Sequence, residues 1–381
     1  MSDIKKSLCI ILAAIAAFSL ASCSNGEKHE EIAHKIYVRD DSKSEKITAK
    51  FINSSNGNTA EKAMDKISEG EDFSTFSVTG DAGNFNKVSF TYDSSETYEV
   101  AFNEYVSGWY ISTFGMVPYT EGKDNLTEVK YETKTFDYKD YKKDVYIWTP
   151  KGYDKKSKDK YSVIYTEDGE RTLFAGTSDS TCWNVAESVT SMMSLSDNRA
   201  IIVAISTPEG TTRSEELTPD IGELKSDDLM FQHKEGKYFS DFVCNTVMPY
   251  IEKNYNVYTD GAHNSICGSS LGGLESFYIG MEHPDKFGAI GAMSSTFSLF
   301  DMDTWKEYIS AKKFDENSPF IYFYAGDDKA DGGKHTRQMY DYMTGVYPKD
   351  KLFCDTYSNG EHLTEYWRYI FPEFLKYAFR K

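Results

Sequence analysis

The chain has 381 residues, of which 40% are hydrophobic and 15% aromatic, so it can build a full core and is not disordered by composition. Its formal net charge of −18, without a basic block, argues against a nucleic acid as partner. A length in this range favours two domains, or one large α/β domain with appendages.

The first residues have the features of an export signal. A positively charged start precedes an apolar run, Leu8 to Leu20, that is too short to span a bilayer comfortably. The run ends in Leu20-Ala21-Ser22-Cys23, which resembles the bacterial lipobox, whose cysteine receives diacylglycerol. We expect residues 1–22 to be a lipoprotein signal peptide and residues 23–34 a tether that anchors the exported protein to the cell envelope or surface through Cys23. An ordinary cleaved signal is the alternative.

Four cysteines remain after the signal and the lipid attachment site are set aside: Cys182, Cys244, Cys267 and Cys354. They are widely spaced, and none forms a C-x-x-C pair or has metal-ligand spacing with histidine. This pattern disfavours a metal site, and we expect buried thiols.

Residues 35–125 are predicted to form a small β-sandwich-like domain. Short alternating or aromatic runs, such as Val88–Tyr92 and Tyr98–Phe102, are separated by Gly, Asn, Asp and Ser. Trp109 and Tyr110 are either a carbohydrate-stacking platform or, more commonly for such residues, part of a core.

Strands and helices alternate through residues 128–381. Val145–Trp148, Ser162–Tyr165 and Ala200–Ile205 have the composition of strands, the last two apolar enough for the middle of a sheet. A helix follows, with apolar positions at helical spacing from Phe239 to Ile251, and Pro249 is expected to bend or re-cap this helix rather than to prevent it. The alternation predicts an α/β fold with a mainly parallel central sheet and helices on both faces.

The most specific motif is a G-x-S-x-G sequence from Gly268 to Gly272, between an apolar strand and a helical stretch. This is the context of a nucleophile elbow, a turn so tight that side chains two residues before and after the serine would collide. The motif predicts Ser270 as a nucleophile, with the positive end of the following helix directed at it.

A serine nucleophile needs a base, which in this fold comes late in the chain. His283 is explained by termination of the elbow helix, and His335 by a polar stretch that opens another helix. His362 lies in a turn-forming loop between a strand-like segment and the final helix, Tyr366 to Phe379. We therefore predict His362 as the general base.

The acid should follow the penultimate strand, Phe320–Tyr324, where Asp327, Asp328 and Asp331 compete. We favour Asp328, because it lies far enough past the preceding glycine to turn back towards His362. Asx hydrogen bonds within a turn would explain the remaining aspartates.

The oxyanion formed in such chemistry needs two backbone donors. The N–H of Leu271 follows the nucleophile, and the loop Thr166–Glu170 follows an earlier strand. Gly169 allows this loop to approach the elbow, and we predict the Glu170 N–H as the second donor. We expect no cofactor and no metal ion.

These residues resemble the Putative esterase family of α/β-hydrolases, which includes feruloyl esterases, siderophore trilactone esterases and S-formylglutathione hydrolases. The resemblance covers about residues 128–381 and rests on the elbow together with the segments 145–153, 165–169, 213–219, 283–288 and 360–362. It implies ester hydrolysis through an acyl-enzyme, with Ser270 and His362 matching the family's nucleophile and base. The family usually has its acid about three residues past the strand-ending glycine, where this chain has Lys329.

We therefore expect a cell-surface serine esterase that acts on feruloyl or acetyl esters of plant polysaccharide. A siderophore trilactone esterase is the first alternative. Its anionic ferric chelate would require a basic pocket, to which Arg213 could contribute. An inactive, lipid-anchored carbohydrate-binding protein is the second. Trp183 and Phe231 are candidate pocket aromatics, with core packing the competing role.

Overall fold

The computed structural model of the chain describes residues 32–40, 42–71, 73–93, 97–103, 108–112, 115–118, 130–173, 182–208, 210–225, 233–357 and 360–379. The predicted signal peptide, Cys23 and Phe231 lie outside these residues. Across the described ranges, no helix is both long and apolar enough to cross a membrane.

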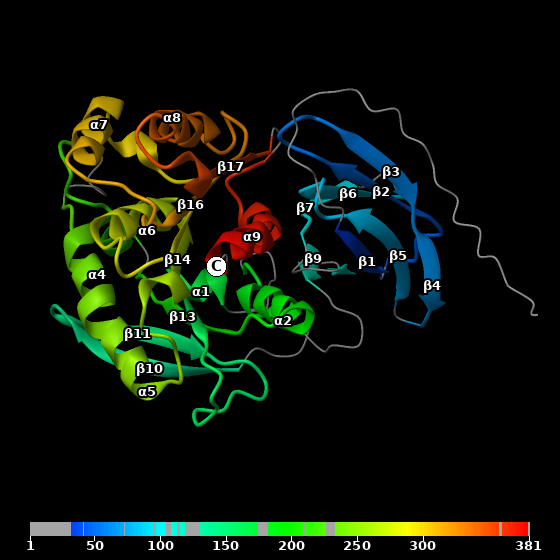
Figure 1. Ribbon diagram of the computed structural model, residues 1–381, viewed down its shortest axis with the longest axis horizontal. Helices are drawn as coiled ribbons and strands as arrows, with labels where there is room; N and C mark the ends of the chain where they lie inside the picture. Colours follow the sequence, from blue (N-terminus) through cyan, green and yellow to red (C-terminus); the bar gives the residue numbers. More distant parts are fainter. Residues whose placement is uncertain are drawn as a thin grey trace, which may run out of the picture.

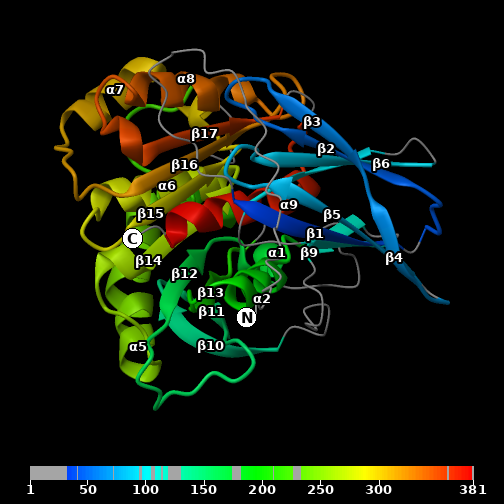
Figure 2. The same cartoon turned by 45° about the vertical axis from the view of Figure 1, so that its right-hand side comes forward.

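The described residues of the N-terminal region form two sheets that face a shared core (Figures 1 and 2). One sheet has the order β4-β5-β1-β8-β9, from Asp65–Glu69, Ser74–Asp81, Ala33–Asp40, Gly108–Ser112 and Gly115–Pro118. The other has the order β3-β2-β6-β7, from Thr59–Ala63, Ile47–Ile52, Lys87–Tyr92 and Thr97–Ala101. Neighbouring strands are antiparallel except β1 and β8, which are parallel. The β-sandwich-like fold predicted for this region is confirmed.

The core of this sandwich consists of apolar side chains that alternate along the strands, including Phe51, Phe76 and Phe90. Trp109 is 1% exposed and packs against Phe90, with ring centroids 5.5 Å apart. It is therefore a core residue and not a carbohydrate-stacking platform. The side chain of Tyr110 lies outside the described part of the structure.

Among residues 130–379, so far as the structure describes them, an eight-stranded sheet runs in the order β10-β11-β13-β12-β14-β15-β16-β17. β10 and β11 are antiparallel to their neighbours, and the strands from β13 to β17 are mutually parallel. In the order of the sheet from β10 to β17, the eight strands span Tyr131–Tyr138, Tyr141–Trp148, Ala200–Ile205, Ser162–Thr166, Asn264–Ser269, Ala289–Met293, Phe320–Ala325 and Leu352–Thr356. Every residue of β12, β13 and β14 is buried, and β13, Ala200–Ile205, is apolar throughout, as expected for a strand in the middle of a sheet.

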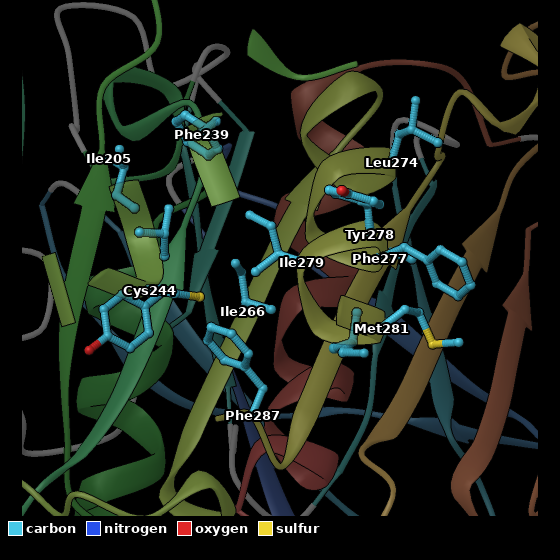
Figure 3. Packing of buried hydrophobic residues seen from close by; sticks show 14 of the residues in the cluster. Ile205, Phe239, Cys244, Ile266, Leu274, Phe277, Tyr278, Ile279, Met281 and Phe287 are labelled. Atoms are coloured by element: carbon cyan, nitrogen blue, oxygen red, sulfur yellow. The ribbon is translucent and has the colours of Figure 1, made fainter. Parts of the chain in front are cut away.

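Helices cover both faces of this sheet, as the sequence predicted (Figure 1). One face packs against α4, α5, α6, α7 and α8, which span Gly236–Phe242, Met248–Asn254, Leu271–Glu282, Met302–Ser310 and Gly333–Met343. The other packs against α2 and α9, which span Val185–Leu195 and Thr364–Ala378. Two short helices, α1 and α3, span Gly169–Thr172 and Thr211–Glu216. Figure 3 shows Ile266 of β14 among the apolar side chains that α6 contributes to the first core, such as Ile279.

A π-helical segment, Val243–Val247, lies between α4 and α5, and α5 begins with Pro249 in its first turn, which is the re-capping foreseen for this proline. Proline has no N–H, and its ring clashes with the carbonyl four residues before it. Wider turns before Pro249 accommodate this clash and keep the helix continuous.

The sandwich is attached to the second domain through α9 and the end of β17. Asn103 donates from Nδ2 to the Pro372 carbonyl at 2.7 Å, and Tyr369 of α9 belongs to the sandwich core. Lys87 of β6 donates from Nζ to the Thr356 carbonyl at 2.7 Å. The two parts therefore share a buried interface of apolar and polar contacts.

The four cysteines of the described residues are thiols that form no disulfide. Cys182, Cys244 and Cys267 are buried, as expected for structural thiols, and Cys354 is half-buried.

Candidate active site

Ser270 lies at the turn between β14 and α6, with the backbone φ of 59° that a nucleophile elbow requires. A Cβ on Gly268 would lie 2.5 Å from the carbonyl carbon of Gly272, closer than real Cβ contacts allow. A Cβ on Gly272 would lie 3.2 Å from Asp168 Oδ2. The collision expected at Gly268 is thus present in the structure, whereas a side chain at position 272 would make a tight contact with Asp168.

The backbone around Ser270 fixes the turn. The Ser270 N–H donates to the Met293 carbonyl at 3.0 Å, and the Ser270 carbonyl accepts from the Thr296 N–H at 3.2 Å. The Ser270 hydroxyl lies 3.4 Å from the hydroxyl of Thr296. Leu271 is the first residue of α6, so its N–H has no acceptor within the helix.

His362 and Asp331 form the pair that the triad logic requires. His362 Nδ1 lies 2.9 Å from Asp331 Oδ1, and the Asp331 side chain is 0% exposed. Asp331 Oδ2 accepts from the Gly326 N–H at 2.7 Å and from the Ser294 hydroxyl at 2.9 Å. Both oxygens of the carboxylate therefore have partners, and the imidazole is held by a fixed acid.

The prediction that Asp328 turns back towards His362 is wrong. The Asp328 carboxylate is paired with the Arg337 guanidinium, and its side chain is 57% exposed. The reason is a helical turn, in which the Asp331 N–H donates to the Asp327 carbonyl at 2.9 Å. Asp327 Oδ1 caps this turn by accepting from the N–H groups of Lys329 and Ala330. The turn places position 331 towards the histidine and position 328 outwards.

The other two late histidines have the structural roles that their sequence context indicated. His283 Nε2 lies 3.1 Å from the Ser240 hydroxyl, and burial lowers the pKa of this imidazole. His335 lies in the first turn of α8.

Ser270 and His362 line the same cleft, which has a volume of about 430 Å³. Its wall also includes Trp183 and Trp367, whose rings lie 6.0 Å apart, and the half-exposed Leu363. The other lining residues are Glu167, Asp168, Arg171, Thr172, Arg213, Ser269, Thr364 and Glu365. Trp183 is 1% exposed, so it combines both roles foreseen for it, core packing and cleft wall.

The loop after β12, Glu167–Glu170, is here named the oxyanion loop. Asp168 has a φ of 51°, and its carboxylate accepts from Arg213 Nε at 2.6 Å and Nη2 at 2.7 Å. The Thr207 hydroxyl donates to the same carboxylate at 2.8 Å. This bidentate pair ties the oxyanion loop to α3 and neutralises much of the charge that Arg213 brings to the cleft.

Glu170 is the second residue of α1, so its N–H has no backbone acceptor within that helix, and it donates to the carboxylate of its own side chain. Its carboxylate accepts from the Tyr146 hydroxyl at 3.3 Å and the Thr207 N–H at 3.4 Å, and burial raises the pKa of this carboxyl. The use of the Glu170 N–H as an oxyanion donor stays a prediction.

Sequence reasoning missed two residues that organise the site. Ser294 has a φ of 45°, donates to Asp331, and accepts from Trp367 Nε1 at 2.8 Å. Asp168 is the anchor of the oxyanion loop. Ser294 acts through tertiary contacts that leave no local pattern in the sequence.

No group of three or more His, Cys, Asp or Glu side chains within the described ranges has the geometry of a metal site.

A family model for the Putative esterase family matches residues 140–375. The chain belongs to this family. A segment of 89 residues is 32% identical to the uncharacterized protein YbbA of Bacillus subtilis (strain 168), covering 23% of this chain and 36% of that relative's length.

Several solved structures share this fold. The enterobactin esterase FES from Shigella flexneri, solved with enterobactin, has a TM-score of 0.52 at 16% identity, covering 91% of this chain and 92% of that one. The BES protein from Bacillus cereus has a TM-score of 0.51 at 18% identity, covering 68% and 98%. An IroE-like serine hydrolase from Shewanella oneidensis has a TM-score of 0.50 at 17% identity, covering 63% and 78%. The α/β-hydrolase fold class predicted from sequence is confirmed.

Proposed function

We propose that this chain is a serine carboxylic-ester hydrolase that acts through an acyl-enzyme. The observation that carries the proposal is the common cleft of Ser270, at a strained elbow, and His362, which is paired with the buried Asp331. A nucleophile and a base in one cleft, with a buried acid behind the base, are the parts that acyl transfer needs.

In the proposed reaction, His362 takes the proton of the Ser270 hydroxyl as the serine oxygen attacks the ester carbonyl carbon. The N–H groups of Leu271 and Glu170 stabilise the oxyanion. The carbonyl reforms, the alcohol leaves with the proton from His362, and an acyl-serine remains. His362 then takes a proton from a water molecule, which attacks the acyl-serine. The carboxylic acid product leaves, and the proton on His362 returns to Ser270.

The charges of the cleft favour a neutral ester over an anionic one. Asp168 and Arg213 neutralise each other in a bidentate pair, and Arg171 and Glu365 carry opposite charges. Leu363 is 47% exposed beside His362 and offers an apolar surface to the organic part of the substrate. These features support feruloyl or acetyl esters of plant polysaccharide as the substrate class.

A siderophore trilactone is the second candidate substrate. It is supported by the similarity to the Shigella flexneri enterobactin esterase, which extends over 91% of this chain and so includes the sandwich. The cleft arginines are the groups that would meet an anionic chelate.

A fluorophosphonate probe tests the mechanism, because it reacts with activated serines and requires no knowledge of the substrate. We expect labelling of the wild-type protein, loss of labelling in Ser270→Ala, and full labelling in Ser310→Ala, which changes an exposed serine on α7. Labelling that persists in Ser270→Ala would contradict the proposal.

Turnover of feruloyl or acetyl xylan, measured against turnover of a catecholate trilactone, separates the two substrates. Preferential release of ferulate or acetate supports the polysaccharide ester, and preferential opening of the trilactone supports the siderophore. Failure on both would reject both substrate classes.

The proposed location is the cell envelope, with a lipid on Cys23. Labelled palmitate should enter the wild-type chain and be absent from Cys23→Ala. Incorporation that survives this substitution would exclude the anchor.

A further inference from the structure

Glu167 is a buried acid at the junction between the oxyanion loop and the elbow. It is 1% exposed and lines the cleft that contains Ser270 and His362. The Glu167 N–H donates to the Cys267 carbonyl of β14 at 3.2 Å. The mechanism proposed above leaves this side chain without a role.

The side chain bridges two elements that must keep a fixed relation during catalysis. Its Oε1 accepts from the Ser276 hydroxyl of α6 at 3.1 Å. Its Oε2 lies 3.3 Å from the position that a Cβ on Gly272 would take, and Asp168 Oδ2 lies 3.2 Å from the same position. Glu167 thus fills the space between the start of the elbow helix and the oxyanion loop.

The groups that face Glu167 disfavour a negative charge on it. Among the described residues, no hydrogen-bond donor reaches Oε2. Two acids lie near it, Glu275 of α6 and Asp168 of the same loop, together with the buried thiol of Cys267 in β14. The nearby cation, Arg213, already donates to the Asp168 carboxylate. Burial, with Glu275 and Asp168, raises the pKa of Glu167 well above its usual range, against the lowering effects of Ser276 and Arg213.

We propose that Glu167 is a positioning residue that, as a neutral carboxylic acid, holds the oxyanion loop against the nucleophile elbow. This inference rests on the proposed function, because it concerns the geometry of the same acyl-transfer site. Loss of the proton would set two carboxylates against one point at the start of α6. The positive end of that helix would offset only part of the resulting repulsion.

The consequence is a loss of activity at alkaline pH that is caused by ionisation of Glu167. Above the pKa of this group, the oxyanion loop moves away from the elbow, and the donors for the oxyanion lose their alignment. We expect kcat to fall by about tenfold per pH unit there, as for any single required proton, with a smaller change in KM.

The test compares wild type, Glu167→Gln and Glu167→Ala between pH 6 and pH 10. It measures the rate of fluorophosphonate labelling and kcat for hydrolysis of a simple aryl ester. Thermal unfolding at each pH is the control for folding. Glutamine keeps the shape and cannot ionise, so Glu167→Gln should remove the alkaline loss. Alanine removes the bridge, so Glu167→Ala should lower kcat at every pH by about tenfold or more while the protein stays folded.

The outcomes separate the two claims. Labelling of the wild type with superimposable pH profiles in wild type and Glu167→Gln overturns the inference and leaves the proposed function intact. A folded Glu167→Ala with unchanged kcat also overturns it. Absence of labelling in the wild type at every pH overturns the proposed function and the inference with it.

Discussion

At the scale of single residues, the orientation of His362 depends on how completely Asp331 is held. The carboxylate has the Gly326 N–H and the Ser294 hydroxyl on one oxygen and the imidazole on the other. Ser294 in turn accepts from Trp367, whose ring packs edge-on against His362 with centroids 5.0 Å apart. The acid and the base are therefore positioned by one connected set of buried groups.

This arrangement predicts that Asp331→Asn inactivates the protein without unfolding it. Asparagine keeps the shape but cannot stabilise the imidazolium, and it favours the wrong tautomer, so kcat should fall by about 10³ to 10⁴-fold. Steady-state hydrolysis of a simple aryl ester measures the effect. Asp328→Asn is the matched control and should retain activity, since its carboxylate is half-exposed and paired with Arg337. Equal losses in both variants would contradict the assignment of Asp331.

Ser270 and His362 could be predicted from sequence because each obeys a local or topological rule. The glycines of the elbow follow from sterics, and the position of the histidine follows from chain order. The acid could not be selected, because three aspartates within five residues differ only in how the turn at Asp327 curls the chain. That turn is decided by hydrogen bonds to Lys329 and Ala330 that side-chain identity alone does not reveal.

At the scale of elements, α6 carries an acid inside the core. Glu275 is 0% exposed, and among the described residues neither of its carboxyl oxygens has a hydrogen-bond donor. Burial raises the pKa of this group well above its usual range, and the neighbouring Glu216 adds to the effect. The folded protein therefore keeps a proton on Glu275 that the unfolded chain loses above about pH 4.3.

Stability should accordingly decline as pH rises from about 4.3 towards the raised pKa of Glu275, because the folded state binds more protons than the unfolded state in that window. In Glu275→Gln this group no longer titrates, so the variant should unfold at a higher temperature than wild type. The difference in unfolding temperature should be larger at pH 8 than at pH 5. Thermal unfolding at the two pH values measures this. Glu307→Gln, an exposed change on α7, should show no such difference. A Glu275→Gln variant that loses stability equally at both pH values would reject the prediction.

Strand and helix positions in the second domain followed from apolar runs and helical spacing, and the irregularity near Pro249 followed from the proline itself. The buried acids did not, because the burial of Glu275 and Glu167 results from contacts that only the packed structure creates. Single polar residues within an apolar pattern carry no signal for whether they face water or the core.

At the scale of the whole molecule, the sandwich and the hydrolase domain are joined by polar contacts that are out of water. Lys87 of β6 is 4% exposed; its Nζ lies 3.4 Å from Asp355 Oδ1 of β17 and 3.3 Å from the centroid of the Tyr357 ring. Asp355 is 0% exposed, and burial raises its pKa in spite of Lys87. The sequence predicted the fold class of both regions, but a lysine in a strand pattern does not indicate which distant carboxylate it will meet.

The contacts of Lys87 at this interface predict that its substitution lowers the free energy of unfolding substantially. Lys87→Met keeps the apolar stem but leaves Asp355 buried without its cation and the Thr356 carbonyl without its donor. We expect a loss of about 3–5 kcal/mol in the free energy of unfolding, measured by urea titration at neutral pH. Lys62→Met, which changes an exposed lysine that donates to the Thr79 carbonyl within the sandwich, should cost less than about 1 kcal/mol. Adding Asp355→Asn to Lys87→Met should recover part of the loss, because it removes the unpaired charge; a double variant no more stable than the single would show that the charge is not the cause.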